Sequence, residues 1–228
     1  MSCRLNVPRQ KEAAKSQRSK QMIQIEINNK EYEVPTTFSD ITLKEYCRIF
    51  SGLEKTDGLE GKELFLANKR NEAAILSRIM GEEDGFAMEL PLSLYSSLVE
   101  ATKFIYGLQD IKHKGFIDLD GKTYKASKPE EMNLRQWIDI DVTAEDESPD
   151  KFIDILSMLL VEVGEDGERK PYKGYDKAFA QRLGDTKCSE SLPIVYRFFL
   201  RGVVSSRVSR LYSMMAAVGH SLRDTQSS

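Results

Sequence analysis

The chain contains few of the residues that form disulfides, metal sites and catalytic pairs. Its 228 residues include three cysteines, Cys3, Cys47 and Cys188, and two histidines, His113 and His220. An odd number of widely spaced cysteines predicts free thiols in a reducing compartment and not a disulfide framework. Neither histidine has a cysteine or a second histidine near it in the sequence, so we expect no zinc site. A Cys–His nucleophile would require a thiol and an imidazole to meet in the fold.

Sequence motifs of nucleotide binding and nucleophilic catalysis are absent as well. The chain has no G-x-x-x-x-G-K-[ST] or G-x-G-x-x-G phosphate loop and no G-x-S-x-G elbow. The acidic residues 139–154 lack the glycine and the terminal glutamate of an EF-hand loop. Ser148-Pro149 predicts a solvated, turn-prone linker there, and a weak contact with a metal or a basic partner is the alternative. We therefore expect no enzyme activity, no cofactor and no resident metal.

Long apolar runs are missing. No run approaches the roughly 20 residues that a membrane helix needs, and the charged N-terminus lacks the apolar stretch of a secretory signal. Hydrophobic residues make up 40% of the chain and charged residues 30%, which is typical of soluble globular proteins. A chain of this length forms one large domain or two small ones.

Two segments of the chain are similar to each other. Residues 25–32 read IEINNKEY and residues 117–124 read IDLDGKTY. Both alternate apolar and polar residues, as half-buried strands do, and both place Asn-Asn or Asp-Gly where a two-residue hairpin turn requires positive φ. A capping box at residues 42–45 follows the first hairpin, and residues 133–136 repeat it with an asparagine cap and a glutamine that reaches back. This recurrence predicts a tandem duplication; two unrelated hairpins in one α+β fold are the alternative.

The rest of the chain repeats more weakly. AAILSRIMG at residues 73–81 resembles FIDILSMLL at residues 152–160, and Leu90-Pro91 and Leu192-Pro193 each predict the start of a helix. We therefore predict an α+β, helix-rich fold: a tandem duplication of a β-hairpin followed by helices, with a long C-terminal helix. Its predicted parts are a disordered basic arm over residues 1–20 and two hairpin-plus-helices units, 21–110 and 111–228, the second with an insertion over 164–190.

The first 20 residues form a basic arm on an acidic body. The arm has a net charge of +5, whereas the rest of the chain sums to −8. Because it has almost no large apolar groups, the arm is predicted to be disordered in isolation. Such an arm binds nucleic acid without sequence specificity, or an acidic protein surface; a solvating tail is the alternative. Its basic residues are Arg4, Arg9, Lys11, Lys15, Arg18 and Lys20.

The predicted C-terminal helix, at about residues 192–222, combines positive charge with apolar surface. Residues 194–223 hold five arginines and no acid. We interpret residues 194–205 as a core helix and residues 206–222 as an intermolecular contact, with a second copy of the chain or with a different protein. The expected contact residues are Arg207, Arg210, Tyr212, Met214 and Met215.

The insertion at residues 164–190 is predicted to be a long surface loop with a short helix at DKAFAQRL. Long loops in compact domains are commonly functional or flexible. We therefore interpret this segment as a binding loop and expect Tyr172 and Tyr175 to contact a partner.

The motifs I-E-I-N-N-K-E-Y-E-V-P, I-T-L-K-E-Y, I-L-S-R-I-M-G-E and E-L-P-L-S-L-Y occur in this order. The pattern resembles small proteins of tailed bacteriophages, of the tail-assembly chaperone or baseplate-hub-assembly type, and related virion components of phages that infect gut Bacteroides. The resemblance covers residues 23–140 and the LPIVYRFF segment. It implies a non-enzymatic role in assembly, with other phage structural proteins as partners. The expected location is the virion, and the host cytoplasm during assembly. The basic arm and the arginine-rich helix depart from this pattern and suit a protein that stays in the particle.

Three functions follow as hypotheses. The first is a phage structural or assembly protein that works by protein–protein binding in the tail, the connector or the interior of the virion, with self-association as one form of that binding. The second is a transient tail-assembly chaperone. The third is an accessory protein that binds nucleic acid through residues 1–20.

Overall fold

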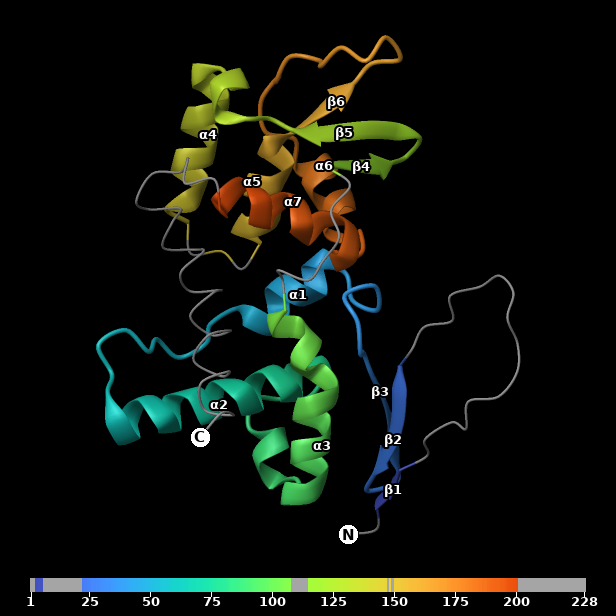
Figure 1. The fold of residues 1–228 in the computed structure, drawn as a ribbon, viewed down its shortest axis with the longest axis vertical. Helices are drawn as coiled ribbons and strands as arrows, with labels where there is room; N and C mark the ends of the chain where they lie inside the picture. The colour runs from blue at the N-terminus through green and yellow to red at the C-terminus, as the bar shows by residue number, and fades with distance from the viewer. Residues whose placement is uncertain (1–2, 6–21, 108–114, 147, 149, 201–228) are drawn as a thin grey trace. The chain divides into compact units, whose positions relative to one another are not determined.

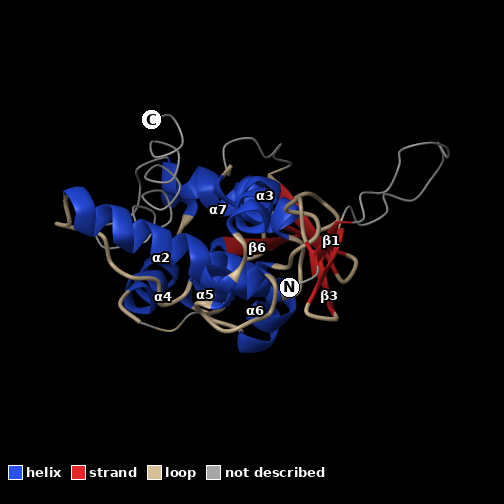
Figure 2. Ribbon diagram, turned by 90° about the horizontal axis from the view of Figure 1, so that it is seen from below, coloured by secondary structure: helices blue, strands red, loops and turns tan. Residues whose placement is uncertain are grey.

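The computed structural model describes residues 3–5, 22–107, 115–146, 148 and 150–200 (Figure 1). Within these residues the chain combines α-helices with two three-stranded antiparallel sheets (Figure 2). The predicted α+β, helix-rich class is therefore confirmed. The chain divides into two compact units. We call Met1–Ile41 with Leu53–Ile105 the first unit, and Thr42–Gly52 with Tyr106–Ser228 the second unit.

The first unit packs one face of a small sheet against helices. Ile25 and Ile27 on one strand and Tyr32 and Val34 on the next are buried in one core with Leu76, because side chains of one strand face point the same way at every second residue. The sheet has the order β1-β2-β3. Its elements are β1 (Cys3–Leu5), β2 (Ile23–Ile27), β3 (Lys30–Val34), α2 (Gly61–Ile79), the 3-10 helix η1 (Phe86–Glu89) and α3 (Leu92–Thr102), which the 3-10 helix η2 (Lys103–Tyr106) follows.

The second unit is built around one helix, α5, which is almost entirely buried. Helices α1, α4 and α6 all contact α5, and the sheet has the order β4-β5-β6. The elements are α1 (Leu43–Phe50), β4 (Phe116–Leu119), β5 (Lys122–Ala126), the 3-10 helix η4 (Pro129–Glu131), α4 (Leu134–Ala144), α5 (Lys151–Leu159), β6 (Leu160–Val163), α6 (Lys177–Gly184) and α7 (Cys188–Leu200).

The hairpins of the two units have the same turn and the same register. Ile25 pairs with Tyr32 in the first hairpin, and Ile117 pairs with Tyr124 in the second. The turn residues all have φ between 52° and 74°, as a type I′ turn requires; they are Asn28, Asn29, Asp120 and Gly121. The repeated hairpin predicted from the sequence is therefore confirmed.

Both helices that follow a hairpin begin at a capped residue. Thr42 accepts a hydrogen bond from the Glu45 amide, and Glu45 Oε2 accepts one from the Thr42 amide at 2.7 Å, as the predicted capping box requires. Asn133 Oδ1 likewise accepts from the Gln136 amide at 2.8 Å. The prediction that the Gln136 side chain reaches back is wrong. This side chain is 2% exposed, and its Nε2 donates into the core, to the Met158 carbonyl at 2.7 Å.

Helix α1 belongs to the second unit although it follows the first hairpin in the sequence. The Leu43 amide donates to the Thr186 carbonyl at 2.9 Å, and Cys188 Sγ donates to the Thr42 carbonyl at 3.1 Å. The chain therefore passes from the first unit to the second after Ile41, returns, and passes again after residue 105. The predicted division at residues 110 and 111 would instead keep this helix with the hairpin before it.

The sequence pattern does not indicate two of the strands. β1 pairs antiparallel with β2, so that Arg4 stands opposite Glu26, within the arm predicted to be disordered in isolation. The edge of β2 supplies backbone partners that an isolated arm lacks. β6 pairs with β5 directly after α5, in residues for which no strand was predicted. The other residues of the arm, 1–2 and 6–20, lie outside the described part of the chain.

The two Leu-Pro pairs occupy different positions. Pro91 is the N-cap of α3, as predicted. Pro193 lies inside α7, so the prediction that it opens this helix is wrong. The Lys187 carbonyl accepts the amides of Glu190 and Ser191, so the helix begins before the proline. A proline inside a helix removes one amide donor and crowds the carbonyl four residues before it. The structure describes α7 to Leu200; its predicted continuation lies outside the described residues.

Candidate partner-binding site

Helix α4 has one apolar side in the core and a second apolar side in solvent. Leu134, Ile138 and Val142 are 74%, 49% and 66% exposed. Residues four apart lie on the same side of a helix, so these three form a continuous strip, which we call the α4 stripe. Surface helices usually carry a single apolar side, and an exposed apolar patch marks an interaction surface. The buried side consists of Gln136, Ile140 and Ala144.

The buried side fixes the orientation of α4 against α5. Ile140 shares a core with Ile155 and Leu159 of α5. The Gln136 side chain donates to Ser127 Oγ at 3.2 Å in addition to its bond to α5. Rotation of α4 about its axis would break these buried hydrogen bonds, which is costly in a core. The α4 stripe is therefore held in a fixed position.

The insertion brings both predicted contact tyrosines to α4 and α5. Tyr172 Oη donates to Asp139 Oδ2 of α4 at 2.8 Å, and Tyr175 Oη donates to Asp154 Oδ1 of α5 at 2.7 Å. The short helix predicted after them is confirmed as α6, with Asp176 as its N-cap. One tyrosine thus ties the loop to α4 and the other ties it to α5.

Gly174 lets the loop pass close to α4 between the two tyrosines. Its φ is +119°, a conformation that favours glycine, and a Cβ atom here would lie 2.9 Å from a guanidinium nitrogen of Arg135. A larger residue would be strained at this φ, and the guanidinium end of Arg135 would have to shift. Glycine therefore suits this position between the two tyrosines.

Both tyrosine hydroxyls stay protonated far above neutral pH. Burial, reinforced by the hydrogen bond to Asp154, raises the pKa of Tyr175 to about 12. Burial, with the hydrogen bond to Asp139, also raises the pKa of Tyr172 well above its usual value. These phenols therefore donate hydrogen bonds to carboxylates and do not act as bases.

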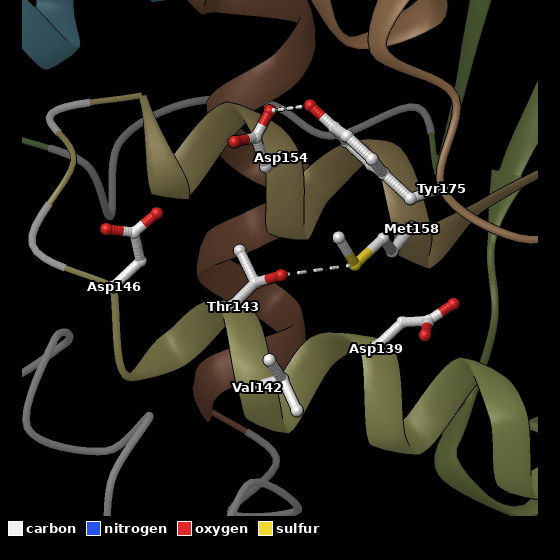
Figure 3. Close-up of a pocket in the computed structure, with 7 residues that line it drawn as sticks. All are labelled: Asp139, Val142, Thr143, Asp146, Asp154, Met158 and Tyr175. Atoms are coloured by element: carbon white, nitrogen blue, oxygen red, sulfur yellow. Dashed lines mark hydrogen bonds between the residues drawn. The ribbon is translucent and has the colours of Figure 1, made fainter.

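A pocket of about 290 Å³ opens between α4 and α5, as Figure 3 shows. Val142 belongs both to this pocket and to the α4 stripe, so the two surfaces are continuous. Thr143 Oγ1 lies 3.9 Å from Met158 Sδ within the pocket. Its lining residues are Asp139, Val142, Thr143, Asp146, Asp154, Met158 and Tyr175.

Carboxylates border the α4 stripe. By helical spacing, Asp141 lies on one side of it and Asp139 on the other, and Asp146 and Asp154 join Asp139 in the pocket. The prediction of a solvated linker over residues 139–154 is wrong at both ends, because α4 continues to Ala144 and α5 begins at Lys151. The buried side of α4 and the core of α5 keep Asp139, Asp141 and Asp154 helical, whereas Asp146 follows the end of α4. The helical carboxylates therefore hold fixed positions.

The structure places only some of the predicted contact residues. Tyr175 lines the pocket, Tyr172 donates to Asp139 of α4, and the backbone of Arg4 is in β1. The others lie outside the described residues: Arg9, Lys11, Lys15, Arg18, Lys20, Arg207, Arg210, Tyr212, Met214 and Met215.

Sequence reasoning missed the α4 stripe. The signal was present, because Leu134, Ile138 and Val142 recur every four residues beside a second apolar set that includes Ile140. Two apolar sides on one short helix are more than its core packing requires. The acidic residues between them drew the interpretation toward a loop.

The two cysteines of the second unit are buried. Cys47 is 8% exposed and Cys188 is 0% exposed, and burial raises the pKa of both thiols above the usual range. Because the thiolate is the reactive form, these cysteines pack in the core and are poor nucleophiles. Both histidines lie outside the described residues.

In residues 3–5, 22–107, 115–146, 148 and 150–200, no group of three or more His, Cys, Asp or Glu side chains is placed to hold a metal ion. Over the same part of the chain, every helix is too short or too polar to cross a membrane.

Comparison of the chain with protein-family models, with curated proteins and with solved structures finds no match. The basis for a function is therefore the α4 stripe, the acidic pocket beside it, and the sequence motifs.

Proposed function

We propose that this protein is a non-enzymatic structural or assembly component of a tailed bacteriophage, and that it acts within the virion by binding other structural proteins. One observation carries the binding part of the proposal: α4 exposes Leu134, Ile138 and Val142 on a helix whose orientation is fixed by buried contacts. Preformed apolar surface beside polar groups is the usual anatomy of an interface. The bacteriophage part is supported by the sequence resemblance, whose motifs form the first hairpin and the capped helix α1.

The introduction of charge on the α4 stripe tests the binding. Ile138→Asp with Val142→Asp places two charges on the exposed side, where they leave the core intact. We expect binding to purified structural proteins of the phage to weaken by about tenfold or more, as for a residue at the centre of an interface. Leu92→Asp, at a residue that is 78% exposed in the first unit, is the matched control. Equal binding by both variants and the unaltered chain would contradict the proposal.

Quantitative mass spectrometry of purified particles tests the location. A retained component is present at a fixed copy number in mature virions. A transient tail-assembly chaperone is present in infected cells and absent from those particles. Absence from particles would therefore replace the structural function by the chaperone function.

The basic arm supports nucleic-acid binding as the competing function. Residues 1–20 carry a net charge of +5, and binding through such charge weakens steeply with salt. Deletion of these residues should abolish retention of DNA at low salt if the arm binds it. Unchanged retention would exclude this role for the arm.

A further inference from the structure

We infer that the α4 stripe and the pocket beside it dock an amphipathic helix of a partner protein, whose apolar residues cover the stripe and whose arginine enters the pocket. This inference rests on the proposed function, because it names the partner chemistry of the same site. Three features of the face point to such a partner: the spacing of the stripe, the unbalanced charge of the pocket and the chemical mixture of its lining.

The α4 stripe has the spacing with which one helix packs against another. Leu134, Ile138 and Val142 are four apart and form a single ridge along α4. In pairs of helices such a ridge fits the groove between side chains of the second helix, most often at a crossing angle of about 50°. The ridge runs for about 12 Å along the axis, which matches about two turns of a partner helix with apolar residues three and four apart.

The pocket carries negative charge that its described surroundings do not balance. Of its seven described lining residues, three are aspartates and none is basic. Asp139 and Asp154 accept hydrogen bonds from the two tyrosine hydroxyls, and Asp146 accepts one from the Ser148 amide at 3.1 Å. All of these donors are neutral. A cation supplied by a partner therefore gains charge-assisted hydrogen bonds here.

The lining suits the side chain of arginine better than that of lysine. Figure 3 shows Thr143 and Met158 at the centre of the pocket, with the carboxylates of the three aspartates around them and Tyr175 beside them. Val142 and Met158 provide apolar contact for the aliphatic stem. A planar guanidinium group donates to several separate oxygens and stacks on an aromatic ring, and a volume of about 290 Å³ admits it. An ammonium group reaches fewer of these partners at one time.

Other occupants of the face fit less well. In a symmetric pair of α4 helices the aspartates of one copy would lie against those of the other, and opposed like charges weaken an interface. Nucleic acid and anionic lipid carry negative phosphates, which the same carboxylates repel. Residues 21–228 sum to a net charge of −8, which also favours the approach of a basic partner.

Selection from a library of displayed helical peptides tests the partner chemistry without a known partner. The full chain is the bait, and peptides that also bind the variant Ile138→Asp with Val142→Asp are removed. We expect the remaining peptides to carry apolar residues three and four apart and to be enriched in arginine over lysine and over acidic residues. Fluorescence anisotropy then measures the affinity of each selected peptide for the full chain.

An exchange of charge between peptide and pocket tests the contact itself. Replacement of the selected arginine by glutamate should weaken binding about tenfold, and Asp146→Lys in the protein should restore part of the affinity for that glutamate peptide. Asp146 is exposed and follows the end of α4, so this variant leaves the helix intact. Glu165→Lys makes the same change of net charge at an exposed residue outside the pocket and should restore none. Circular dichroism checks that each variant is folded.

Three results would overturn the inference. Stripe-specific peptides without enrichment in arginine would refute the partner chemistry and leave the stripe as a binding face. Equal restoration by Asp146→Lys and Glu165→Lys would show attraction by net charge alone, with no arginine in the pocket. A selection that yields no stripe-specific peptide would refute the docking of a helix. None of these results bears on the presence of the protein in virions, so the inference and the proposed function fail separately.

Discussion

Tyr32 and Tyr124 hold the same position in two hairpins of the same register, yet their surroundings differ. Tyr32 is buried in the first unit, where its hydroxyl donates to Glu82 Oε1 at 2.9 Å. Tyr124 is half-buried and stacks on Phe179 of α6, with ring centroids 4.6 Å apart. Local sequence thus sets the hairpin, whereas the packing around it depends on elements far away in the chain.

The two units also differ in where a third strand joins the hairpin. An isolated hairpin is only marginally stable, and a third strand or a covering helix stabilises it. In the first unit, β1 is added beside β2; in the second unit, β6 is added beside β5. The two sheets therefore extend from opposite strands of equivalent hairpins. Two hairpins of the same register therefore do not require the same sheet.

Truncation of each core has the largest expected effect and tests whether the two units are independent. Leu76→Ala in the first unit and Leu156→Ala in the second remove side chains that are 1% and 0% exposed. Each should lower the free energy of unfolding of its own unit by about 2–5 kcal/mol. Hydrogen exchange should then accelerate in α2 for the first variant and in α5 for the second. Equal acceleration in both helices would show one cooperative unit.

The hairpin turns provide the second test. Gly121 has φ of 74°, and alanine in this conformation should destabilise the second unit by about 1–2 kcal/mol. Gly121→Asn should cost less, because Asn29 already holds a positive φ at the equivalent position of the first turn. Urea denaturation of both variants measures the difference. Equal losses of stability in Gly121→Ala and Gly121→Asn would show that the second turn does not accept asparagine as the first turn does.

Removal of the tyrosine hydroxyls sharpens the contrast between the hairpins. Tyr32→Phe loses the hydrogen bond to Glu82 and should lower the free energy of unfolding of the first unit by about 0.5–1.5 kcal/mol. Tyr124→Phe keeps the stacked ring on Phe179 and should change stability less. Chemical denaturation of the matched pair measures both effects. A larger loss for Tyr124→Phe would reverse the comparison.

Lowering the pH should have the smallest effect on stability, because the groups involved form exposed ion pairs. Hydrogen bonds from Lys30 and then Tyr32 lower the pKa of Glu82, and those from Lys170 and then Lys122 lower the pKa of Glu162. A depressed pKa stabilises the fold above the unfolded pKa of about 4.3, and this stabilisation is lost as the pH falls through the folded pKa.

Glu82→Gln should therefore reduce the acid sensitivity of the first unit and leave that of the second unit unchanged. Unfolding monitored separately in each unit at pH 7 and at acidic pH measures this. A fall in the acid sensitivity of both units would contradict the separate roles of the two glutamates.

The features predicted correctly from the sequence are those set by neighbouring residues. The turns at Asn28 and Asp120, the caps at Thr42 and Asn133, and helix α6 each depend on contacts within a few residues. The features missed depend on distant partners. β6 forms because its backbone pairs with the edge of β5. The Gln136 side chain turns inward because the Met158 carbonyl lies in the core.

The candidate site was predicted only in part, for a related reason. Tyr172 and Tyr175 were indicated by their place in an unusually long loop, and the structure holds them against two carboxylates of residues 139–154. The α4 stripe was missed because acidic residues interrupt its apolar residues along the sequence. Only the helical spacing shows that Leu134, Ile138 and Val142 share one side.

The position of α1 in the second unit sets an order for folding during synthesis. This helix leaves the ribosome long before the helices that it contacts, α5, α6 and α7, have been translated. Domains generally fold as units while the chain emerges, but the second unit has to wait until α7 is complete. Until then the apolar side of α1 is exposed, whereas the first unit needs nothing beyond residue 105. A truncated product that ends before α7 would therefore contain a folded first unit and an α1 helix that lacks part of its packing.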